Sequence, residues 1–149
     1  MPGDASIYRN PLPCGVSVLN GFAKPAGLTQ IEELGVLETP ILLSNTLAVG
    51  RLFTGLARFM ITHHPEIGRT LPTVNPLVLE CNDGFLNDIQ AMAITESMAQ
   101  QALDLAATDF LRGSVGAGRA RELLRTQRRN RYKFTQDRSP QLYLEAFWC

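Results

Sequence analysis

The 149-residue sequence has little of what marks disulfide-rich, zinc-binding or membrane proteins. Its three cysteines, Cys14, Cys81 and Cys149, are far apart and include no CxxC pair, which argues against a disulfide framework or a zinc site and favours a reducing cytoplasm. The longest uncharged apolar run, residues 40–49, contains three polar residues and is shorter than the roughly 20 apolar residues that cross a membrane. The first ten residues have neither the basic nor the apolar region of a secretory signal. We therefore expect a cytoplasmic protein without membrane contact.

Local motifs for catalysis and nucleotide binding are also absent. The sequence contains no GxSxG, Walker or GxGxxG segment, so no local motif indicates serine hydrolase or nucleotide chemistry. The only two histidines, His63 and His64, are adjacent, and no HExxH or similar spacing surrounds them. We interpret both as surface residues and expect no metal site.

The charges that are present are distributed unevenly. Residues 1–118 carry six basic and eleven acidic side chains, a net charge of −5. Residues 119–149 carry eight basic and three acidic side chains, a net charge of +5. So abrupt a change marks either an added functional tail or a segment of different origin. We therefore treat residues 1–118 as one globular body and residues 119–149 as a basic C-terminal tail.

The body combines short strands with helices. Apolar runs that end in turn residues predict three strands, over 16–19, 40–43 and 77–81. Apolar residues at steps of three and four predict two longer helices, over 47–61 and 95–110. Thr29 as N-cap and Gly35 as a stop predict a short helix over 29–34. We expect an α+β fold with an antiparallel sheet.

Three polar loops follow these elements: Ser44-Asn45-Thr46, Asn82-Asp83-Gly84 and Gly113-Ser114-Val115-Gly116-Ala117-Gly118. Glycines let successive backbone amides converge on one point, as in an oxyanion-binding nest. Ordinary turns and a glycine-rich helix end explain the same residues. The residues alone leave both interpretations open.

In this order the segments resemble the self-processing aminopeptidases of the DmpA type, which include L-aminopeptidase/D-esterases and β-peptidyl aminopeptidases. The resemblance is carried by YRNPLPCGVSVLNGFAKPAGLTQIEELGVLETPILLSNTLAVG, by LECNDGFLNDI and by GSVGAG, and covers residues 7–118. It implies a four-layer αββα fold, of which residues 1–118 would form a central part, incomplete at both ends. It also implies self-cleavage before an internal nucleophile, release of N-terminal residues from small peptides, amides or esters, homo-oligomers, and no cofactor.

The resemblance places the expected site residues as well. Ser114 stands where relatives often carry an asparagine that helps to bind the oxyanion, so a weaker or different donor is implied. Phe59 stands near a position where relatives often have an aromatic hydroxyl. The substrate-facing wall is implied at Asn45, Asn82, Asp83 and Gly84.

The nucleophile of the family has no counterpart in the sequence. It is expected after a glycine or asparagine beyond the glycine-rich loop, at the start of an apolar strand. Ser139 is the one serine beyond residue 118, and Pro140 follows it. We therefore expect no catalytic residue and no activity in this chain.

Beyond residue 118 the resemblance stops. Relatives continue to a motif like KGGIGTSSR, whereas this chain reads RARELLRTQRRNRYKFTQ. Shifting the reading frame of residues 128–136 by one base permits Gly, Gly, Ile, Gly, Thr, Ser, Ser and Arg in succession. Our hypothesis is that residues from about 120 onward are an out-of-frame translation of an aminopeptidase gene. If the DNA does not encode that motif in the shifted frame, the hypothesis is wrong.

The alternative is a non-catalytic binding protein whose tail contacts nucleic acid. Seven arginines between residues 119 and 138 could neutralise several phosphates. Written as a helix, this segment has only a narrow apolar face, at Leu123 and Leu124. The out-of-frame hypothesis also explains the arginines without a role in binding nucleic acid. We therefore expect a small peptide or amide as ligand and no nucleic acid.

Overall fold

The computed structural model describes residues 5–18, 21–84, 87–106 and 142–146. Its α-helices are α1 (Leu28–Leu34), α2 (Val49–His63) and α3 (Glu96–Asp104). Its short 3₁₀ helices are η1 (Ala5–Tyr8), η2 (Thr46–Ala48) and η3 (Ile89–Ala91). Its strands are β1 (Leu12–Val18), β2 (Val36–Leu37), β3 (Ile41–Ser44), β4 (Leu77–Glu80) and β5 (Leu142–Ala146). The mixture of helices and sheets confirms the α+β prediction.

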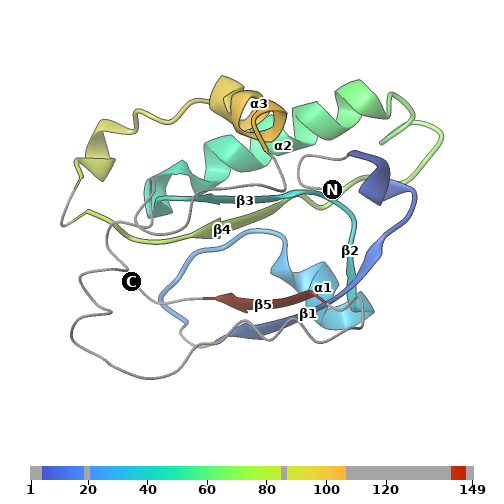
Figure 1. The fold of residues 1–149 in the computed structure, drawn as a ribbon, viewed down its shortest axis with the longest axis horizontal. Helices are drawn as coiled ribbons and strands as arrows, with labels where there is room; N and C mark the ends of the chain where they lie inside the picture. The colour runs from blue at the N-terminus through green and yellow to red at the C-terminus, as the bar shows by residue number, and fades with distance from the viewer. Residues whose placement is uncertain (1–4, 19–20, 85–86, 107–141, 147–149) are drawn as a thin grey trace.

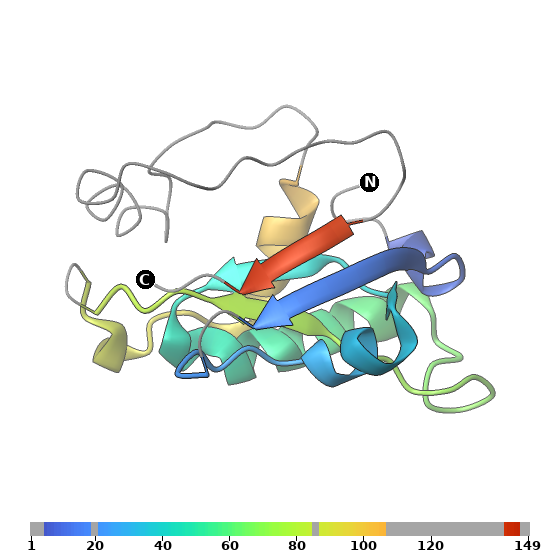
Figure 2. The same ribbon diagram turned by 90° about the horizontal axis from the view of Figure 1, so that it is seen from below.

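The elements are stacked in layers. Helices α2 and α3 lie on one side of β3 and β4, whereas β1, β5 and α1 lie on the other side (Figure 1). Seen from below, β1 and β5 run side by side in front of the β3–β4 pair (Figure 2). Strands β2, β1 and β5 form one sheet in that order, and β3 and β4 form another.

Strands β3 and β4 are parallel, with Ile41 opposite Leu77 and Ser44 opposite Glu80. Parallel neighbours need a crossover connection, and α2 lies between them in the sequence. Among the described strands only β1 and β2 pair antiparallel, because β1 and β5 are also parallel. The expected antiparallel sheet is therefore wrong for the central pair: a strand, a helix and a strand in succession return the chain in the same direction.

The two faces of the β3–β4 pair bury different side chains. Leu42 and Val78 pack with the buried faces of α2 and α3. Leu77 and Leu79 pack on the opposite face with Cys14 and with residues of α1 and β2. Successive side chains of a strand point to opposite faces, so both faces of this parallel pair are covered by apolar groups.

Helix α1 begins differently from the sequence prediction. Gly27, not Thr29, is its N-cap, and no side chain caps the helix start. Gly27 has a positive φ of 90°, and a Cβ there would lie 2.2 Å from the carbonyl oxygen of Pro76. This close approach across the fold selects glycine and moves the helix start ahead of Thr29. The predicted end is confirmed, because the Gly35 N–H donates to the Ile31 carbonyl at 2.9 Å.

The other boundaries agree in part with the sequence predictions. β1 begins at Leu12 instead of residue 16, and the helix predicted over 47–61 is divided into η2 and α2. α3 spans Glu96–Asp104, and residues 107–110 of the predicted helix lie outside the described part. Within the described ranges no helix is long and apolar enough to span a membrane.

The basic tail is described only at β5. The backbone of β5 pairs with β1, from Cys14–Leu142 to Val18–Ala146. The division at residue 118 and the out-of-frame hypothesis stay predictions.

Candidate functional site

Two of the three polar loops meet at the carboxyl ends of β3 and β4. Ser44 lies opposite Glu80 as the last pair of the ladder, and the Cys81 N–H donates to the Ser44 carbonyl at 2.8 Å. The loops that follow, residues 44–46 and 82–84, therefore leave the sheet from the same edge. Ligands of open parallel sheets commonly bind outside the carboxyl ends of the strands, so we examine this edge as the candidate site.

Asn45 caps a short helix at this edge. It is the N-cap of η2, and its Oδ1 accepts hydrogen bonds from the backbone N–H groups of Leu47 and Ala48, both at 3.1 Å. The Ala48 N–H also donates to the Asn45 carbonyl at 3.1 Å, so side chain and backbone of Asn45 together cap the start of η2. The Asn45 oxygen is therefore committed to the backbone.

Glu80 joins both sides of the site, and the sequence reasoning missed it. The Thr46 hydroxyl donates to Glu80 Oε2 at 2.5 Å, and the backbone N–H of Lys24 donates to Oε1 at 2.8 Å. Thr46 is buried and Glu80 half-buried. The available signal was a single carboxylate at the end of the otherwise apolar strand LVLE.

Asp83 is the buried charge of the site, with only 6% of its surface exposed. Its Oδ2 accepts a hydrogen bond from Asn87 Nδ2 at 2.7 Å. Its Oδ1 is buried without a hydrogen-bond partner. Leaving a buried polar atom unpaired costs about 1–3 kcal/mol, and more when the group is charged, so such an atom needs an explanation.

Asn82 and Gly84, the sequence neighbours of Asp83, form an exposed turn. Asn82 Oδ1 accepts a hydrogen bond from the Gly84 N–H at 3.0 Å, which is a common turn pattern for asparagine. Asn82 and Gly84 are exposed, whereas Asp83 is buried. The structure thus brings Asn45, Asn82, Asp83 and Gly84 to one edge, and Ser114 lies outside the described residues.

Phe59 does not contribute to this edge. It is 4% exposed and belongs to the apolar core around α2. Its ring contacts His63 with centroids 4.2 Å apart. A hydroxyl group here would enter the core.

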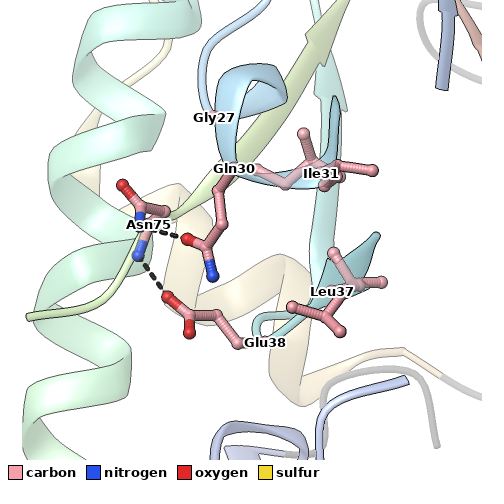
Figure 3. Close-up of a pocket in the computed structure, with 8 residues that line it drawn as sticks. Gly27, Gln30, Ile31, Leu37, Glu38 and Asn75 are labelled. Carbon is pink, nitrogen blue, oxygen red and sulfur yellow. Dashed lines mark hydrogen bonds between the residues drawn. The ribbon is translucent and has the colours of Figure 1, made fainter. Parts of the chain in front are cut away.

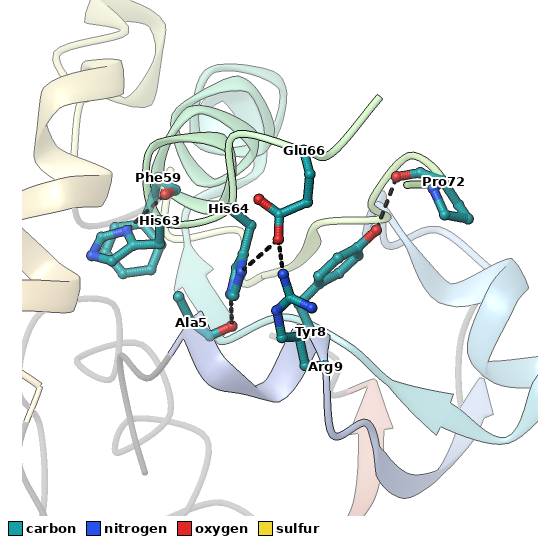
Figure 4. Close-up of polar contacts among 8 residues, drawn as sticks. All are labelled: Ala5, Tyr8, Arg9, Phe59, His63, His64, Glu66 and Pro72. Carbon is teal, nitrogen blue, oxygen red and sulfur yellow. Dashed lines mark hydrogen bonds and ion pairs between the residues drawn. The ribbon is translucent and has the colours of Figure 1, made fainter. Parts of the chain in front are cut away.

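The two histidines differ in burial. His63 is exposed, in agreement with the sequence interpretation, whereas only 12% of the His64 side chain is exposed. His64 is therefore not a surface residue: it lies in a polar cluster with Tyr8, Arg9 and Glu66 (Figure 4). The described residues contain no group of side chains that could hold a metal ion.

A shallow pocket lies away from this edge, between α1 and the start of β4 (Figure 3). Gln30 Oε1 accepts a hydrogen bond from Asn75 Nδ2, and Glu38 Oε1 accepts one from the Asn75 backbone N–H at 2.7 Å. The pocket has no room for a water molecule. We therefore assign no ligand to it.

Comparison with known proteins identifies the family. The profile of Peptidase family S58 matches residues 1–126. The β-peptidyl aminopeptidase BapA of Sphingosinicella microcystinivorans is 27% identical over 111 residues, which are 74% of this chain and 27% of that protein.

Solved structures agree with this match. The PH0078 protein of Pyrococcus horikoshii OT3 has a TM-score of 0.74 at 40% identity, over 79% of this chain and 37% of that chain. The L-aminopeptidase D-Ala-esterase/amidase of Ochrobactrum anthropi, described as a prototype of serine aminopeptidases and a variant of the Ntn hydrolase fold, has a TM-score of 0.65 at 30% identity, over 72% of this chain and 30% of that chain.

This chain therefore spans between about a quarter and two fifths of the length of these relatives. The matches confirm the resemblance seen in the sequence, and the chain has part of the DmpA-type, Ntn-hydrolase-like fold. It belongs to Peptidase family S58, a family of aminopeptidases.

Proposed function

We propose that this chain supplies the substrate-facing wall of an S58 aminopeptidase site, with Asp83 as the group that receives the substrate's N-terminal ammonium. The observation that carries the proposal is the buried and unpaired Oδ1 of Asp83. The ion pairs among the described residues do not include Asp83. A ligand that brings an ammonium group would give this oxygen its missing donor.

An aminopeptidase substrate fits this need. Its free N-terminal ammonium carries three N–H donors and one positive charge, as a lysine ammonium does. Charge-assisted hydrogen bonds are about twice as strong as neutral ones, and they gain further strength away from water. The residues on either side of Asp83 in the sequence, Asn82 and Gly84, are exposed, so the buried carboxylate belongs to a turn at the protein surface.

We propose further that the 149-residue chain binds small peptides or amides without hydrolysing them and without cleaving itself. Covalent catalysis needs a nucleophile beside a base. The one serine beyond residue 118, Ser139, stands between Arg138 and Pro140 and lacks the expected context. A polar wall alone does not replace a nucleophile at a comparable rate.

The binding test uses L-alaninamide and its N-acetyl analogue, which lacks the ammonium. We expect L-alaninamide to shift the NMR signals of Gly84 and Asn87 in a saturable way, and N-acetyl-alaninamide to leave them unchanged. Asp83→Asn keeps the size of the side chain but removes the charge, and it should weaken binding at least tenfold. Equal binding of both probes, or unchanged binding by Asp83→Asn, would contradict the proposal.

The remaining expectations on partners and location are part of the proposal. Self-association, as the resemblance implies, is tested by the molar mass in solution. A cytoplasmic location is tested by cell fractionation. Contact of the +5 tail with nucleic acid, the alternative function, would be revealed by RNA or DNA binding that weakens steeply between low and moderate salt.

A further inference from the structure

Glu80 lies at the junction of the segments that form the candidate site. Its carboxylate accepts from the Thr46 hydroxyl on one side and from the Lys24 backbone N–H on the other. Thr46 directly follows Asn45, and Asp83 is three residues after Glu80. Resting on the proposed function, we infer that Glu80 is a positioning residue, whose carboxylate fixes η2 and the 21–24 loop relative to Asp83.

The two bonds use both oxygens of the Glu80 carboxylate, Oε2 at 2.5 Å from the Thr46 hydroxyl and Oε1 at 2.8 Å from the Lys24 backbone N–H. A glutamine could keep both contacts, because its NH₂ group can donate to the Thr46 hydroxyl oxygen while its carbonyl oxygen accepts from Lys24. A methionine at this position has a side chain of similar length and offers neither carboxylate oxygen, so it removes both bonds.

Within the described part of the chain, the ion pairs do not include Glu80. Its two donors there, the Thr46 hydroxyl and the Lys24 backbone N–H, are neutral groups. The Lys24 ammonium donates instead to the Phe22 carbonyl at 2.8 Å and lies 4.1 Å from the centre of the Phe22 ring. Among these residues the negative charge of Glu80 therefore adds to that of Asp83 in attracting a cationic ligand.

A set of matched variants tests this role. Glu80→Met removes both acceptor oxygens, and Thr46→Val removes the hydroxyl donor with little change in shape. Thr46→Ser keeps the hydroxyl and serves as the conservative rescue. Glu38→Met is the matched control, because Glu38 also accepts from a backbone N–H, that of Asn75, away from this edge.

The first measurement is hydrogen exchange of the Lys24 backbone N–H, with no ligand present. We expect about tenfold faster exchange in Glu80→Met and unchanged exchange in Glu38→Met. Unchanged exchange in Glu80→Met would overturn the inference, whatever the chain binds. This measurement therefore separates a failure of the inference from a failure of the proposed function.

The second measurement is the affinity for L-alaninamide. Glu80→Met and Thr46→Val should each weaken binding about tenfold, and Thr46→Ser should weaken it less than threefold. The double variant should bind no more weakly than Glu80→Met, because Glu80→Met already removes the acceptor of the Thr46 bond. Unchanged affinity in both single variants, or additive losses in the double variant, would overturn the positioning role. If the unmodified chain binds no L-alaninamide while exchange at Lys24 responds as expected, the proposed function fails and the structural role of Glu80 stands.

Discussion

His64 and Ala5, which are 59 residues apart in the chain, are joined by a hydrogen bond from His64 Nε2 to the Ala5 carbonyl oxygen at 2.8 Å. The other ring nitrogen, Nδ1, lies 3.6 Å from Glu66 Oε1, and the imidazole ring packs at 5.4 Å from the Tyr8 ring. The largely buried imidazole of His64 therefore links η1 to the end of α2.

Replacing this imidazole should loosen η1. His64→Phe keeps a ring against Tyr8 but removes the bond to the buried Ala5, so we expect a loss of about 1 kcal/mol in the free energy of unfolding. Denaturant unfolding measures it. His63→Phe is the matched control, because His63 is exposed and its hydrogen bond to the Phe59 carbonyl lies inside α2. Equal losses in both variants would contradict this role of His64.

The carboxyl of Glu66 makes the stability of the folded state depend on pH in the acidic range. A hydrogen bond from its own backbone N–H, together with the charges of Arg9 and His64, lowers the pKa of Glu66 below its ordinary value of 4.5, against a smaller opposing effect of desolvation. A carboxyl whose pKa is lowered by folding stabilises the folded state above its unfolded-state pKa, and this contribution is lost as pH falls through the folded-state value.

We therefore expect Glu66→Gln to flatten the loss of stability below a pH of about 4.5. Thermal unfolding between pH 7 and pH 3 measures the effect. At neutral pH the variant should be less stable than the original chain, and the two should converge in acid. If the stabilities of the two proteins differ by the same amount at every pH, Glu66 does not contribute to the acid dependence.

Two glycines of α2 should respond oppositely to alanine. A Cβ on Gly55 would lie 2.6 Å from the Glu96 carbonyl oxygen and 2.7 Å from Ala99 Cβ, whereas a Cβ on Gly50 meets nothing within 4 Å. Gly50→Ala should stabilise the chain by up to about 1 kcal/mol through helix propensity. Gly55→Ala should destabilise it by about 1–3 kcal/mol because α2 and α3 must separate. Chemical denaturation compares them, and a gain from Gly55→Ala would exclude the close packing of these helices.

Local sequence patterns were enough for most elements of the body. Alternating short apolar runs and helical periodicity indicated β3, α2 and β4 near their observed bounds, because burial imposes these periods directly on the residues. The direction of β4 was mispredicted, although its order after β3 and α2 carried the information: a crossover helix makes the two strands parallel.

The site was predicted less completely, because its features depend on contacts across the fold. The letters of Asn82-Asp83-Gly84 indicate a turn, but they do not say which side chain is buried. The bond between Thr46 and Glu80 joins residues 34 apart in the chain, and no local pattern contains it. Likewise, Gly27 begins α1 because of Pro76, a contact that the capping pattern at Thr29 could not reveal.

The last prediction concerns catalysis by the chain as it stands. The purified 149-residue protein should keep a single intact mass and should not turn over chromogenic amides of β-alanine or D-alanine. By the resemblance to the DmpA-type enzymes we expect the nucleophile after a glycine or asparagine, whereas Ser139 follows Arg138 and precedes Pro140. Intact mass spectrometry and absorbance at the released chromophore measure both activities. A chain with the reading frame restored after residue 119, and with the flanking segments found in relatives, should gain processing and amidase activity.

The matched variant for this experiment is Ser139→Ala. In the original chain it should change neither the mass pattern nor the background rate, because we assign Ser139 no role. In the frame-restored chain, changes at Asp83 should lower turnover, since the substrate ammonium would lose its buried partner. Two fragments cut near Ser139 in the original chain, or turnover that Ser139→Ala abolishes, would show that residues 119–149 contain a working nucleophile.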